Sequence, residues 1–118
     1  MFKVLDITKE NVFALKVTGK VKAEDYDHII PLLDKMIREY GNIRCLADLS
    51  ALEAVKPDAF WKDFLFSIKH ARQFEKVAIV GATPVIEGLS KLSSPFTKAE
   101  VKTFDEKEIM AATNWIHA

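Results

Sequence analysis

Residues 42–66, NIRCLADLSALEAVKPDAFWKDFLF, decide the fold of this chain. Within 42–49 the apolar residues, Ile43, Cys45 and Leu46 among them, point to both sides of an extended strand. A strand that is buried on both faces belongs in the middle of an α/β sheet. We therefore predict a central strand here, followed by a loop and an amphipathic helix, with the rest of the chain packed onto this unit.

The predicted helix begins at Lys56-Pro57-Asp58, because proline is favoured in a first helical turn and an acidic side chain there interacts favourably with the helix dipole. Apolar residues recur at three- and four-residue intervals and share one face: Phe60, Trp61, Phe64, Leu65, Ile68 and Ala71. Phe66 projects on the far side, among charged residues. The helix is thus expected to bury one aromatic face and to expose one aromatic side chain.

A hairpin and a long helix precede this unit. Residues 2–7 and 11–18 are rich in β-formers, and the second run alternates apolar and polar side chains, which is typical of an antiparallel hairpin. The next segment predicts a helix that continues in phase across Pro31, with a bend there, and ends at Gly41. Its apolar stripe consists of Tyr26, Ile29, Ile30, Leu33, Met36, Ile37 and Tyr40.

The C-terminal part alternates strands and helices. Residues 77–80 predict a buried strand, 83–92 a short helix that ends at a Ser-Ser-Pro break, and 101–104 an edge strand. Asp105 and Glu108 have the spacing of a capping box for a last helix over 106–116. The element order is therefore ββαβαβαβα. It predicts a single α/β domain over residues 1–118, with a mixed sheet of about five strands and four helices.

The composition narrows the function classes. The 118 residues are the length of one domain, and 17 basic against 17 acidic residues give no net charge. Because non-specific nucleic-acid binding needs a basic surface, no nucleic-acid partner is expected. No apolar run approaches the ~20 residues of a membrane span. The single cysteine, Cys45, excludes an internal disulfide and fits a reducing cytoplasm.

Motifs of catalytic, metal or cofactor chemistry are absent from the sequence. His28, His70 and His117 are far apart, and no His/Cys/Asp spacing matches a metal site. The four glycines form no phosphate loop, and there is no nucleophile elbow. The turn at 81–84 joins a strand end to a helix start, a place where an anion can bind in any α/β protein. We expect no enzymatic activity, no cofactor and no metal.

Packing patterns along the whole chain carry a resemblance to a known family. They are CLADLS at 45–50, the aromatic helix from Pro57, VAIVG at 77–81, SPF at 94–96 and the C-terminal helix with Trp115. In these patterns the chain resembles the SpoIIAA-like family of small bacterial proteins, which is related to STAS and CRAL-TRIO-type domains. The resemblance implies a STAS-like fold.

One position departs from the pattern of the anti-sigma-factor antagonists, the regulatory STAS domains. These carry a phosphorylatable serine at the start of the second helix, where this chain has Lys56, Pro57 and Asp58. The nearest serine is Ser50, at the strand end, where a side-chain turn or cap is the ordinary role. Asp58 either mimics a fixed negative charge or stabilises the first helical turn.

Two functional hypotheses follow. The first is a binding module that takes an apolar small molecule or lipid, or associates peripherally with the inner membrane face, through its second and third helices. Its predicted contact residues are Phe60, Trp61, Phe64, Phe66, Leu89 and Phe96. The alternative is a protein-interaction regulator of the antagonist type without the usual serine, with Asp58 and Ser50 at the switch position. Edge strands and exposed aromatic residues also predict a homodimer.

Overall fold

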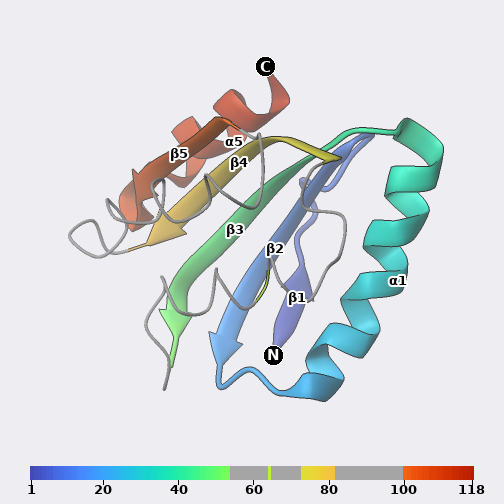
Figure 1. Ribbon diagram of the computed structural model, residues 1–118. Coiled ribbons are helices and arrows are strands. Elements are labelled where there is room, and N and C mark those ends of the chain that lie inside the picture. The colour runs from blue at the N-terminus through green and yellow to red at the C-terminus, as the bar shows by residue number, and fades with distance from the viewer. Residues whose placement is uncertain (54–63, 65–72, 82–99) are drawn as a thin grey trace.

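The computed structural model describes residues 1–53, 64, 73–81 and 100–118. At its centre lies a five-stranded sheet whose strands follow one another in chain order (Figure 1). The strands are β1 (Phe2–Val4), β2 (Val12–Gly19), β3 (Ile43–Leu52), β4 (Phe74–Gly81) and β5 (Glu100–Asp105). β1 is antiparallel to β2, whereas β2 to β5 are mutually parallel. The predicted mixed sheet and opening hairpin are thus confirmed, and β3 is the central strand.

Both faces of the sheet are covered by apolar packing. Since successive side chains of a strand point to opposite faces, β2, β3 and β4 each supply both cores. One core contains Phe13, Leu15, Val17, Cys45, Ala47, Leu49, Val77 and Ile79. The other contains Val12, Ala14, Leu46, Ala78 and Val80. This burial on two sides is what the apolar run of residues 42–49 predicts.

Helix α1 (Ala23–Tyr40) covers the first face (Figure 1). It packs through its buried residues Tyr26, Ile29, Leu33 and Ile37. The helix runs through Pro31 as one element, as its stripe predicts, and Asp25 fixes its start by accepting a 2.8 Å hydrogen bond from the Lys22 N–H. That bond is the largest cause that lowers the pKa of Asp25. Gly41, at φ +80°, ends the helix in a conformation that suits glycine.

Helix α5 (Ile109–His117) covers the second face, after the short 3₁₀ helix η2 (Glu106–Glu108). The predicted capping box is present, because the Asp105 N–H donates to Glu108 at 2.9 Å and the Lys107 N–H donates to Asp105 at 3.0 Å. At the other end of α5, Arg44 donates 3.0 Å to the Ile116 carbonyl oxygen. This places a cation of β3 at the C-terminus of the helix, where the dipole favours it.

The described residues contain two α-helices, α1 and α5, of the four that the sequence predicts. The predicted helices at 57–71 and 83–92 fall outside the described part, apart from residue 64. Strand limits also differ from the prediction. β1 ends at Val4 instead of residue 7, because Asp6 and Ile7 form a turn, and β3 continues to Leu52 instead of residue 49.

Candidate functional site

The carboxyl end of β3 carries a β-bulge. Lys16 pairs with Asp48 and Thr18 with Ala51, so β3 has one residue more than β2 between these two pairs. A bulge leaves one backbone N–H outside the ladder and re-aims the side chains next to it. In open α/β sheets, ligands bind outside the carboxyl ends of the strands. The bulge therefore falls where a binding site is expected.

At the bulge, the Asp48 side chain supplies the hydrogen-bond acceptor for the backbone N–H of Ser50. The Ser50 backbone N–H donates a 3.0 Å hydrogen bond to Oδ1 of Asp48, and the Ser50 hydroxyl donates a 2.6 Å bond to the same oxygen. Ser50 is exposed, and Asp48 is half-buried. We call these two side chains the Asp48–Ser50 pair. It presents a hydroxyl and a carboxylate in one fixed arrangement at the rim of the sheet.

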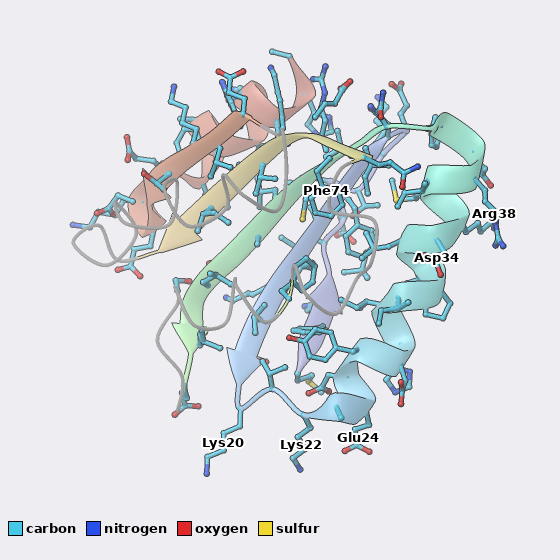
Figure 2. All side chains as sticks on the ribbon, in the orientation of Figure 1. Lys20, Lys22, Glu24, Asp34, Arg38 and Phe74 are labelled. Carbon is cyan, nitrogen blue, oxygen red and sulfur yellow. The ribbon has the colours of Figure 1, made fainter. Side chains whose placement is uncertain are left out.

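A hollow of about 350 Å³ lies at the same end of the sheet, beside the end of β2. Figure 2 shows Lys20, Lys22 and Glu24 of its lining pointing away from the body of the protein. The ends of β2 and β3 are tied together, because the Glu53 N–H donates 2.9 Å to the Gly19 carbonyl oxygen. Gly19 has φ +61°, a value that favours glycine. The hollow is lined by charges of both signs.

Phe64 is the one residue of the predicted aromatic helix that the structure describes. It is 1% exposed, in the α1-side core. Its ring centroid lies 6.4 Å from that of Phe2 and 6.3 Å from that of Tyr26. The side chain thus contributes to packing, which is the ordinary role of an aromatic stripe. Its predicted role toward a ligand stays a prediction.

The remaining predicted site residues lie outside the described residues. They are the switch-position residue Asp58 and the predicted contacts Phe60, Trp61, Phe66, Leu89 and Phe96. The structure describes Ser50 and Phe64, the first on the surface and the second in the core. Sequence reasoning missed Asp48. The signal was available, since an acidic residue two positions before a serine is a frequent acceptor of its backbone and hydroxyl donors.

Cys45 is buried, and burial raises the pKa of its thiol to about 12. Its protonated form is therefore inert as a nucleophile at neutral pH. Within the described ranges, no group of three or more His, Cys, Asp or Glu side chains is placed to hold a metal ion. None of the helices described here is both long enough and apolar enough to cross a membrane.

Comparisons with known proteins agree with this architecture. The SpoIIAA-like family profile matches residues 12–117. A crystal structure from Shewanella loihica PV-4, of an uncharacterised DUF3478-family protein with a SpoIIAA-like fold, is 31% identical and superposes with a TM-score of 0.66. The match covers 89% of this chain and 83% of that one. No curated protein matches the sequence.

Proposed function

This chain belongs to the SpoIIAA-like family, and from that premise we propose that it is a non-enzymatic binding module that recognises a protein partner at the carboxyl end of β3. The Asp48–Ser50 pair carries this proposal. Two hydrogen bonds within β3 fix its hydroxyl and carboxylate relative to each other, and Ser50 is exposed. Groups that are already ordered lose little conformational entropy when a partner binds, so they favour recognition.

The hydrogen bonds of Ser50 support binding over catalysis. A nucleophilic serine needs a base that takes its proton and a third group that orients the base. The Ser50 hydroxyl donates directly to a carboxylate, and among the described residues no histidine bonds to either member of the pair. Because both donors of Ser50 already bond to Asp48, the pair offers a partner hydrogen-bond acceptors, the hydroxyl and carboxylate oxygens, which carry a negative charge.

The same geometry opposes control by phosphorylation at Ser50. A phosphate there would bring about two negative charges at neutral pH next to the Asp48 carboxylate, which now lies 2.6 Å from the hydroxyl. Like charges at that separation repel each other, and the bond that fixes the hydroxyl would be lost. We therefore propose that partner binding is constitutive, in contrast to the phosphorylation-dependent switch of the antagonist STAS domains.

Affinity capture with conservative variants tests this function. Asp48→Asn keeps an oxygen that accepts the Ser50 N–H, so the bulge is retained while the charge is removed. Ser50→Ala removes only the hydroxyl. Lys107→Glu, at an exposed position of η2, is the control for a surface charge change. We expect one stoichiometric protein partner that the control retains and both site variants lose. Equal capture by all variants, or phosphorylated Ser50 in the purified protein, would overturn the proposal.

Burial of Phe64 favours a second candidate function. Phe64 is buried. In the helix that the sequence predicts, which turns about 100° per residue, Phe66 is expected about 160° from Phe64, on the outward side. We propose that residues 57–71 and 83–92 bind an apolar ligand or an anionic membrane surface, with Phe66 as the outward contact.

Vesicle binding tests this second function. Phe66→Ser should reduce co-sedimentation with anionic vesicles, relative to wild type, without a change in thermal unfolding. Neutral phosphatidylcholine vesicles separate the electrostatic from the apolar contribution. Failure to bind either vesicle, together with no lipid in native mass spectra of the purified protein, would contradict it.

A further inference from the structure

An apolar groove lies at the other end of the sheet from the Asp48–Ser50 pair. It has a volume of about 290 Å³ and runs between the second half of α1 and the segment that links β1 to β2. Phe13 of β2 and Met36 of α1 contribute to its lining. Of the five large apolar side chains that are exposed in the described part of the chain, three line this groove: Val4, Leu32 and Tyr40, at 40%, 45% and 49% exposure.

Helix α1 therefore has two apolar stripes. The first is buried against the sheet, and the second consists of Leu32, Met36 and Tyr40, at i, i+4 and i+8 on one side of the helix. These three residues span about 12 Å along the axis. Apolar residues gathered in one groove, in contrast to scattered ones, are typical of an interaction surface.

The charges at the groove indicate what covers it. Lys35 and Glu39 are one helical turn apart on α1, and Lys9 and Glu10 line the facing wall. The charges sum to zero, so a strongly basic or strongly acidic partner gains nothing there. A second copy of the same surface does gain, because a two-fold axis places each lysine near a glutamate of the other copy. The chain as a whole has zero formal charge, so two copies do not repel each other at long range.

We propose that two copies of this protein pair through the groove, with their α1 helices antiparallel about a two-fold axis near Met36. Leu32 of each copy then faces Tyr40 of the other, and Lys35 faces Glu39 of the other. Each of these contacts occurs twice by symmetry, as in any isologous interface. Val4, on the edge strand β1, extends the apolar surface beside the helices. This surface is separate from the proposed partner site, so the two proposals are independent.

Charge reversal tests both the dimer and its symmetry. Lys35→Glu places only acidic side chains at the α1 contact, and Glu39→Lys places only basic ones. Each variant alone should weaken dimerisation about tenfold or more in sedimentation equilibrium, because like charges then meet twice. An equimolar mixture of the two variants should form a heterodimer of wild-type affinity. Lys107→Glu, far from the groove, should dimerise as wild type does.

Other occupants of the groove give different results. A wild-type chain that stays monomeric at millimolar concentration overturns the proposal, and Tyr40-dependent binding of an apolar dye by that monomer would assign the groove to a small molecule. If the wild-type protein dimerises and neither charge reversal weakens the dimer, the interface lies elsewhere, and the proposal is also overturned. Circular dichroism of each variant confirms that the fold is retained, so a loss of dimer cannot be ascribed to unfolding.

Discussion

Ser50 donates both its backbone N–H and its hydroxyl to the same carboxylate oxygen of Asp48, at 3.0 and 2.6 Å. The first bond replaces the ladder partner that the bulge removes, and the second orients the exposed hydroxyl. Asp48 thus stabilises the end of β3 and also shapes the proposed recognition surface. A variant that tests recognition without loss of stability must therefore keep a hydrogen-bond acceptor at position 48.

Asp48→Ala should therefore destabilise the protein more than Asp48→Asn. Alanine removes the acceptor of two hydrogen bonds, and because Ser50 is exposed, water replaces that acceptor, so the cost should be about 0.5–1.5 kcal/mol. Asparagine retains the acceptor, so its cost should be no more than about half of that. Urea unfolding of both variants checks the difference, and equal losses would show that the bond to the backbone contributes nothing.

The raised pKa of the buried Cys45 thiol predicts that the protein loses stability at alkaline pH. The thiol has a pKa of about 12 in the folded protein and about 8.5 in an unfolded chain. Between these values the unfolded state releases the thiol proton while the folded state keeps it, so the free energy of unfolding falls as pH rises. The contribution is up to about 1.4 kcal/mol per pH unit. Cys45→Ala should lack this contribution in denaturation curves from about pH 8 to pH 10; identical slopes would contradict the assignment.

Arg44 should hold α5 on the sheet. Its guanidinium donates to the Ile116 carbonyl oxygen at 3.0 Å and lies 2.8 Å from a Glu75 carboxylate oxygen. Arg44→Met should cost about 1–2 kcal/mol and speed amide exchange in α5. Glu75→Gln is the matched control and should cost no more than about 0.5 kcal/mol, because the Glu75 side chain is 40% exposed. Unchanged exchange in Arg44→Met would exclude the role of this contact.

Phe64 and Phe66 should respond differently to truncation. Phe64→Ala removes a ring that is 1% exposed and should cost about 3–5 kcal/mol. Phe66→Ser should change the free energy of unfolding by no more than about 0.5 kcal/mol, since the sequence predicts an outward position. Thermal and urea unfolding measure both. A large loss at Phe66 would make it a core residue and remove the case for an outward contact.

Replacement of Glu10 by glycine should stabilise the protein. Glu10 is the one non-glycine residue of the described chain with positive φ, at 54°. A side chain in this region costs about 1–2 kcal/mol, which glycine avoids at some loss of entropy in folding. Glu10→Gly should therefore raise the free energy of unfolding by about 0.5–1 kcal/mol. Glu10→Ala keeps the backbone strain and serves as the control. If Glu10→Ala stabilises the protein as much as Glu10→Gly does, relief of strain is not the cause of the gain.

The fold could be predicted because its signals are local. The apolar run of residues 42–49, the alternation along 11–18 and the glycine at position 41 each act within a few residues. They identify a central strand, a hairpin and a helix end without reference to the rest of the chain. The family prediction is confirmed over residues 12–117 for the same reason, since it also rested on packing patterns.

The candidate site was predicted less completely. Ser50 was identified at the strand end, but its partner Asp48 was not, because the bulge arises from the register between β2 and β3. That register depends on residues more than 30 positions apart in the sequence. The predicted ends of β1 and β3 were wrong for a related reason. The length of a strand depends on how far its neighbours offer hydrogen-bond partners.

Tyr40 shows most clearly what the sequence determined and what the tertiary structure decided. Its position in the apolar periodicity of residues 26–40 was sufficient to predict a helix with one apolar side. The same periodicity placed Tyr40 in one apolar stripe with Tyr26 and Ile29, but these two side chains are buried, whereas that of Tyr40 is 49% exposed. Periodicity specifies the direction in which a side chain points. Only the docked sheet determines which part of that side has a surface to pack against, because burial requires atoms that distant segments bring into contact.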